Sequence, residues 1–306
     1  MMRKILAVML CLACLAGSAL AADMSEVRGY DKSAENDYQY LALGTYPYEE
    51  DGTEAPLLWR ILYREGDTLT LFTEYLIDTH QVFEIENYKD AVKKHKFSKT
   101  TVFEETDLFK WVNGEMTQTI MKNQDFSPAV IEAEGGLFHI MDYMELRRTE
   151  YGFPNSRYGN TAENSWEHPT PLAKNRKAWG TPYAQAKVIY PDWSKETKHY
   201  KLIQYGSYGN SSPYWTADLR PDLGGMVGAN GHLSVHGKGD VQIGVRPAMM
   251  LDLTKLELTG GQGTLEDPWR MELKGGAAET AETSEEEAPE EAAETDDTEN
   301  TEETEE

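Results

Sequence analysis

Between Tyr214 and Leu253 the chain alternates short apolar runs with glycine-rich turn signals. The apolar ends of this stretch, Tyr214-Trp215 and Ile243 to Leu253, predict buried strands. Three turn signals separate them: Gly224-Gly225, Asn230-Gly231 and Gly237 to Gly239. Asn230-Gly231 is the strongest, because a two-residue type I′ turn requires positive φ at both central positions. The stretch therefore predicts two or three short hairpins.

Upstream, the same alternation predicts a sheet that begins the fold. A strand over 41–47 precedes a hairpin in which 57–63 pairs with 68–73 across Glu65-Gly66-Asp67. Trp59, which alternates with its polar and apolar neighbours, belongs to a strand with two largely apolar faces. Such a sheet is expected to be covered on both sides.

The remaining pattern predicts two helices and a long irregular region. Thr106 or Asp107 caps a helix whose apolar residues recur four apart from Leu108 to Ile120, and Asn113-Gly114 should weaken it without ending it. Asp142 caps a second helix. The region 152–193 is rich in loop residues yet contains three tryptophans, which predicts an ordered insertion with one helical turn over 182–187. The last strand is expected at 269–273.

The two ends of the chain differ in composition from the middle. Residues 1–21 have the basic start, apolar run and small-residue end of a secretory signal peptide, so we expect an exported protein in the cell envelope or outside the cell. An alternative is a lipoprotein modified at Cys14. Residues 22–37 predict a flexible spacer, 38–274 a single globular domain, and 275–306 a disordered acidic tail.

Charge and cysteine content narrow the functions further. The formal net charge is −24, and although the tail supplies much of it, the remainder is still acidic. Nucleic acid and anionic membrane surfaces are therefore not expected partners, and no membrane insertion of the mature chain is predicted. Both cysteines, Cys11 and Cys14, lie in the leader, which excludes disulfides and cysteine chemistry from the mature domain.

No established catalytic or metal motif is present. His232 and His236 are four apart, but in an extended segment their side chains lie about 13 Å apart, too far for one zinc ion. Asp218, Asp222 and Asp240 favour Asx turns over a calcium site, since the EF-hand spacing is absent. Paired carboxylates of a hydrolase remain an open alternative. We expect no catalytic residue, metal or cofactor.

Six motifs together resemble a known family. They are LGTYP at 43–47, PLLWRIL at 56–62, DLFKWVNGEM at 107–116, TPYAQAK at 181–187, YWTADLR at 214–220 and GVRPAMMLDL at 244–253. In order and spacing they resemble the bacterial extracellular domain-of-unknown-function family 6273. That family is similar to the C-type-lectin-like fold of formylglycine-generating enzymes. The resemblance implies an α+β, C-type-lectin-like mixed fold with small antiparallel sheets, two main helices and a long irregular loop region, but no activity.

These observations predict a monomeric, non-enzymatic binding module for a glycan or a cell-surface protein. The alternative is an envelope or extracellular hydrolase that uses acidic residues. Aromatic rings beside planar hydrogen-bonding groups suit sugar or peptide recognition. The candidate ligand-binding residues are Tyr208, Tyr214, Trp215, Asp218, Arg220 and Asp222. For Tyr214 and Trp215 a position in the core is an equally good interpretation. Arg246, before Pro247, is expected to be structural and to bind a carboxylate or a carbonyl group.

Overall fold

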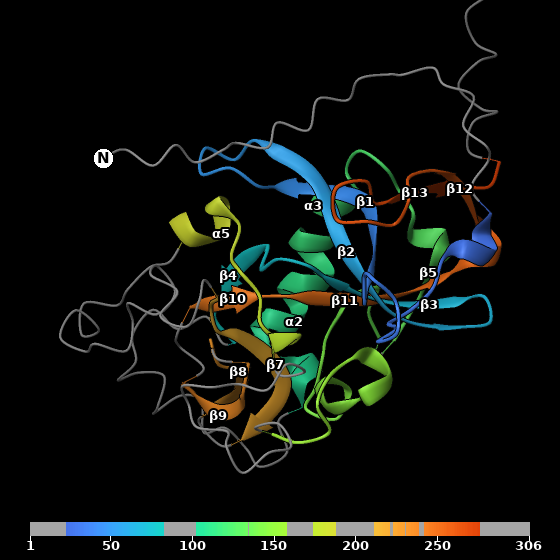
Figure 1. Cartoon of the computed structure of the whole chain (residues 1–306). Helices are drawn as coiled ribbons and strands as arrows, with labels where there is room; N and C mark the ends of the chain where they lie inside the picture. Colours follow the sequence, from blue (N-terminus) through green and yellow to red (C-terminus); the bar gives the residue numbers. More distant parts are fainter. Residues whose placement is uncertain are drawn as a thin grey trace, which may run out of the picture. The chain divides into compact units, whose positions relative to one another are not determined.

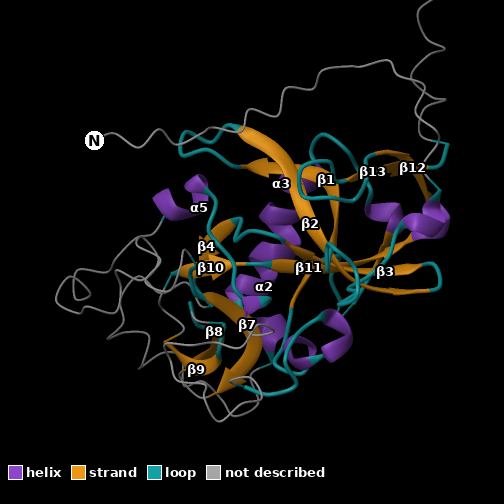
Figure 2. Ribbon diagram, viewed as in Figure 1, coloured by secondary structure: helices purple, strands orange, loops and turns teal. Residues whose placement is uncertain are grey.

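The protein has a mixed α+β fold, seen here in a computed structural model (Figure 2). The structure describes residues 23–82, 102–133, 135–157, 174–187, 211–220, 223–229, 231–238 and 242–275. The chain divides into two units, Met1–Lys274 and Gly275–Glu306, and all the helices and strands below belong to the first. The predicted signal peptide and all but the first residue of the predicted acidic tail lie outside the described residues.

The larger sheet contains eight strands and holds both ends of the described domain. Along the sheet the strands are β12 (Leu256–Gly260), β13 (Trp269–Leu273), β1 (Gln39–Pro47), β2 (Glu54–Glu65), β3 (Thr68–Thr73), β11 (Pro247–Asp252) and β5 (Val130–Ile131), with β6 (His139–Ile140) also on β11. All pairs are antiparallel except β1 and β13. The predicted β2–β3 hairpin and the closing strand are confirmed.

The smaller sheet has five strands in the order β4 (Asp78–His80), β10 (Ile243–Val245), β7 (Tyr214–Arg220), β8 (Leu223–Val227) and β9 (Leu233–Lys238). Strands β8 and β9 form the predicted hairpin, but the reversal is longer than the expected two-residue type I′ turn. β8 ends at Val227 and β9 begins at Leu233, and the Gly231 amide, at φ of 81°, donates to the carbonyl of Gly228 at 2.8 Å. Gly224-Gly225 was expected to mark a reversal but lies inside β8, where Gly225 lets Thr216 and Asp218 of β7 approach closely.

The chain crosses between the two sheets twice at the same place. From β3 in the large sheet it runs through residues 74–77 to β4 in the small one, and from β10 it returns through Arg246 to β11. Figure 1 shows β10 and β11 as one nearly continuous ribbon. Arg246 is the single residue between β10 and β11.

One fifteen-residue helix, Asp107–Met121, consists of α2 (Asp107–Trp111), a π-helical turn at Val112–Met116 and α3 (Thr117–Met121). The Thr106 side chain caps it by accepting a hydrogen bond from Phe109, as predicted. The π turn includes Asn113-Gly114, so these residues deform the helix without ending it. In the part of the chain that the structure describes, no helix is long and apolar enough to span a membrane.

The other helical segments are short. The second α-helix is α5 (Pro182–Ala186), capped by Thr181 at the position where a helical turn was expected. The longer helix predicted after Asp142 is absent, and two 3₁₀ turns, Glu145–Arg147 and Thr149–Tyr151, take its place. Gly152 ends the second of them in the left-handed conformation, with φ of 77°.

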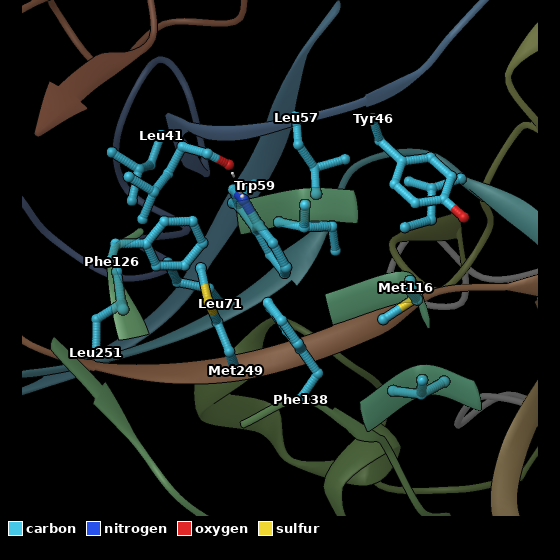
Figure 3. Packing of buried hydrophobic residues seen from close by; sticks show 14 of the residues in the cluster. Leu41, Tyr46, Leu57, Trp59, Leu71, Met116, Phe126, Phe138, Met249 and Leu251 are labelled. Carbon is cyan, nitrogen blue, oxygen red and sulfur yellow. Dashed lines mark hydrogen bonds between the residues drawn. The ribbon is translucent and has the colours of Figure 1, made fainter. Parts of the chain in front are cut away.

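The core lies between the long helix and both sheets. Trp59 of β2 is fully buried, stacks on Phe138 with ring centroids 5.8 Å apart, and donates its indole N–H to the carbonyl of Leu43 (Figure 3). The same cluster contains helix side chains such as Met116 and small-sheet side chains such as Val245. A second cluster contains Leu62 of β2 and Phe72 of β3, which alternate with the β2 and β3 residues of the first cluster. Buried residues therefore cover both faces of these strands, as predicted.

The conformation and packing of residue 44 explain why the LGTYP motif has glycine there. It has φ of 71°, at an irregularity in the β1–β2 register. A Cβ there would lie 2.8 Å from the Ile120 side chain, closer than packed carbon atoms approach. The close contact lets α3 pack directly on β1.

Residues 23–37 differ from the expected flexible spacer. Val27 is buried, and Arg64 of β2 donates hydrogen bonds of 2.6 Å to the carbonyls of Met24 and Val27. Tyr30 donates its amide to Leu62. The apolar residues of this segment are too few to show a period in the sequence. The segment is nevertheless held beside β2, because Val27 is buried and β2 supplies hydrogen-bond partners.

Candidate functional site

The structure describes the side chains of three of the six predicted site residues. Tyr208 and Asp222 lie outside the described residues, as does the side chain of Arg220 at the end of β7. Tyr214 and Trp215 are 1% exposed, which corresponds to the alternative interpretation that both are core residues. The Tyr214 hydroxyl donates to the carbonyl of Arg176 at 2.6 Å, and the Trp215 indole donates to that of His80 at 2.8 Å.

Asp218 is half-buried and serves the backbone. One carboxylate oxygen accepts hydrogen bonds from the Tyr143 amide at 2.8 Å and from the Thr216 hydroxyl at 3.0 Å. Burial raises the pKa of Asp218, and these hydrogen bonds oppose the rise. The carboxylate therefore has a structural role that ties β7 to the segment after β6.

Arg246 lies at the junction of the two sheets and is completely buried. Its guanidinium donates to the carbonyl of Thr73 at 2.7 Å, and more weakly to those of Arg176 at 3.3 Å and Glu74 at 3.4 Å. It also lies 3.9 Å from the centre of the Phe72 ring. The carbonyl partners agree with the structural role expected from sequence, and they fasten one chain crossing to the other.

A second arginine beside this junction forms an ion pair. Arg60 of β2 contacts the Glu74 carboxylate at 2.6 Å and donates to the carbonyl of Asn175 at 2.7 Å. The two side chains are 8% and 18% exposed, so Glu74 reaches the surface while Arg60 lies beneath it. Because the carboxylate is held from below by a charged hydrogen bond, its orientation is fixed before any ligand arrives.

Two half-buried tyrosines, Tyr40 and Tyr75, lie near Glu74, and a third, Tyr48, packs on Tyr75. Tyr40 pairs with Arg60 across β1 and β2, and the rings of Tyr48 and Tyr75 meet edge to face with centroids 6.3 Å apart. Burial, together with Tyr48, Glu74 and Tyr40, raises the pKa of Tyr75 to about 12, and burial and Glu74 raise that of Tyr40. Their hydroxyls are therefore neutral hydrogen-bond donors at physiological pH. We call Tyr40, Tyr48, Tyr75 and Glu74 the tyrosine–glutamate face.

Sequence reasoning did not find this face. Tyr40 and Tyr48 flank a predicted strand and Tyr75 follows another, and no local spacing relates them. A signal was available in the cross-strand register, since pairing 41–47 with the 57–63 strand places Tyr40 opposite Arg60.

Another charged group stabilises the segment after β6. Glu145 accepts a hydrogen bond of 3.1 Å from the Asp142 amide, and its other oxygen lies 3.1 Å from the His139 ring. The Asp142 carboxylate in turn accepts from the Glu145 amide at 2.8 Å. Burial opposes ionisation of Glu145, but the His139 and Asp142 contacts outweigh it and lower the pKa of Glu145. These carboxylates are occupied by structural partners and supply no observation in favour of the hydrolase alternative.

The lowered pKa of Glu145 predicts a loss of stability in acid. Its contribution is complete above the unfolded value of 4.5 and is lost as the pH falls through the lower folded value. We expect the free energy of unfolding, measured in urea between pH 6 and pH 3, to fall less steeply in Glu145→Gln than in the unmodified chain. Glu104→Gln, an exposed substitution, serves as the control. Equal slopes for all three proteins would contradict the prediction.

The structure therefore shows an α+β protein in which a buried arginine holds Glu74 beside half-buried tyrosines. Comparison with protein-family models, characterised proteins and solved structures gives no match for this chain. The resemblance to family 6273 therefore stays a prediction.

Proposed function

We propose that this chain is an exported, non-enzymatic binding module and that the tyrosine–glutamate face binds a neutral glycan. The supporting observation is the Glu74 carboxylate, held by buried Arg60 close to half-buried Tyr40 and Tyr75, with Tyr48 packed on Tyr75. Tyrosine rings can pack on the C–H faces of sugar rings, and carboxylate and phenol oxygens can bond sugar hydroxyls. The signal-peptide pattern and the resemblance to an extracellular family support export.

The charge of the face favours a neutral glycan over an acidic one. The Glu74 carboxylate is paired with Arg60 at 2.6 Å, so the four residues offer no unpaired cation to an anionic group, while the remaining oxygen lone pairs can accept hydrogen bonds from sugar hydroxyls. The strand ends and loops that carry the four residues are held by the sheet and by the crossing between the sheets, so little ordering entropy is lost on binding. A surface protein, the other ligand class expected from sequence, would be recognised through the same rings.

A glycan array followed by calorimetry on the best neutral glycan tests this proposal. Tyr75→Ala is expected to weaken binding roughly tenfold, because one stacking ring of about 1.4 kcal/mol is removed. Tyr75→Phe keeps the ring and should lose less. The matched control is Tyr63→Phe, because Tyr63 of β2 is also half-buried but packs on Tyr151, outside the tyrosine–glutamate face. This variant should bind normally. Binding that is unaffected by Tyr75→Ala, or cleavage of the bound glycan, would overturn the proposal.

A further inference from the structure

Arg176 is a buried arginine whose guanidinium is only partly used. It is 0% exposed, and its Nη2 donates to the carbonyl of Ser156 at 3.0 Å. Its Nε and Nη1 are buried, and among the described residues they have neither a hydrogen-bond partner nor a carboxylate in an ion pair. Three N–H groups of this cation are therefore unused, although almost all buried donors in proteins find an acceptor.

Hydrogen bonds to backbone carbonyl groups hold the segment that carries Arg176 in place. Its carbonyl accepts the Tyr214 hydroxyl at 2.6 Å and an Arg246 N–H at 3.3 Å. The preceding carbonyl, of Asn175, accepts Arg60 at 2.7 Å. The core thus holds Arg176 from one side, while its guanidinium points toward Ser156 on another segment.

Ser156 contributes a second unused donor at the same place. Its hydroxyl oxygen is buried and has no hydrogen-bond partner among the described residues. The residue as a whole is half-buried and follows exposed Asn155, so this end of the site lies just beneath the surface. Arg176 and Ser156 thus both have buried donors without acceptors among the described residues, and the two residues are joined by the hydrogen bond from Arg176 to the Ser156 carbonyl.

The surroundings are basic in a chain whose formal net charge is −24. Burial and then Arg147 lower the pKa of Arg176 to about 10. Burial also lowers the pKa of His232, as do Arg176, Lys177 and Arg157. Among the described residues, the cations that act on Arg176 and His232 are Arg147, Lys177 and Arg157, and cations attract an anion and repel a metal ion.

We infer that Arg176 and Ser156 form a binding site for an oxyanion, the chemical class that includes carboxylate, phosphate and sulfate groups. Oxygens of this class accept hydrogen bonds from guanidinium and hydroxyl donors and neutralise the buried charge. The site is separate from the tyrosine–glutamate face and does not depend on the glycan proposal. The oxyanion comes either from a free inorganic ion or from an acidic sugar.

Calorimetry and thermal unfolding of the purified chain with sulfate, phosphate and glucuronate test this site. Sodium chloride at matched ionic strength corrects for screening. The melting temperature should rise with the concentration of the bound anion beyond the chloride control, because the ligand binds only the folded state. Preference for glucuronate would identify an acidic sugar as the source, and preference for sulfate or phosphate a free ion.

Three variants assign the binding to these residues. Arg176→Met should abolish anion binding, and in anion-free buffer it should be at least as stable as the unmodified chain, because an unpaired buried charge is replaced by an apolar side chain of similar length. Ser156→Ala should weaken binding roughly tenfold and is informative even if Arg176→Met does not fold. Arg270→Gln removes an exposed arginine, 53% accessible and paired with Asp267, and should bind normally.

The opposite results would overturn the inference. They are a melting temperature that follows ionic strength alone, or anion affinities that are the same in Ser156→Ala and the unmodified chain. Loss of neutral-glycan binding in Tyr75→Ala with anion binding intact would show that the two sites are independent.

Discussion

Replacing Arg246 by alanine is expected to destabilise the domain by about 3–5 kcal/mol, the cost of breaking a buried charged network. The substitution leaves the carbonyls of Thr73, Glu74 and Arg176 without their donor in the interior. It also empties the space over the Phe72 ring. For a domain of this size the melting temperature should fall by roughly 10 °C, measured by circular dichroism.

The loss of stability comes from the hydrogen bonds that join the two chain crossings, and not from the charge alone. Arg246→Lys keeps the charge but cannot reach three carbonyls with one ammonium group, so it should recover only part of the stability. Arg270→Ala should change the free energy of unfolding by less than about 0.5 kcal/mol, because its ion pair is exposed. Unchanged stability in Arg246→Ala would show that the crossing is held by strand pairing alone.

Trp59→Ala is expected to cost about 3–5 kcal/mol as well, through a large cavity in the core. The ring is completely buried and lies nearly parallel to Phe138, at an interplanar angle of 8° (Figure 3). Its N–H is the donor to Leu43, beside the left-handed Gly44, so the irregular part of β1 loses support too. Chemical denaturation in guanidinium chloride measures the loss.

Trp59→Phe separates packing from hydrogen bonding. Phenylalanine retains most of the contact with Phe138 but leaves the Leu43 carbonyl unpaired, which costs about 1–3 kcal/mol. Leu265→Ala, at a position that is 43% exposed, should have little effect. If Trp59→Ala and Trp59→Phe were equally destabilised, the hydrogen bond and not the cavity would account for the loss.

Local pattern determined much of the fold. The β2–β3 hairpin follows from two alternating runs around Glu65-Gly66-Asp67, and the start of the long helix follows from Thr106. These features depend on neighbours within a few residues, so sequence spacing is sufficient to predict them. The helix expected after Asp142 was wrong because reciprocal Asp142 and Glu145 contacts cap a turn as readily as a helix.

The position of the aromatic residues was decided by tertiary structure. Alternation shows which side chains share a face of a strand, but not what covers that face. β7 pairs with both β8 and β10, and its first two aromatic rings lie inside the domain, where Tyr214 touches Phe72 of the large sheet. The half-buried tyrosines around Glu74 come instead from segments that the pattern treats as ordinary strand ends.

The sequence by itself thus determined the α+β class, the main hairpins and the buried role of Arg246 before Pro247. Only the tertiary structure decided that Arg60, Arg176 and Arg246 meet at the crossing between the two sheets, with Glu74 as the carboxylate that pairs with Arg60. The physical reason is distance along the chain. Arg60 lies 115 residues from Asn175, and Arg176 lies 70 residues from Arg246. Groups so far apart carry no spacing signal, and even Arg60 and Glu74, 14 residues apart, meet only when β2 pairs with β3.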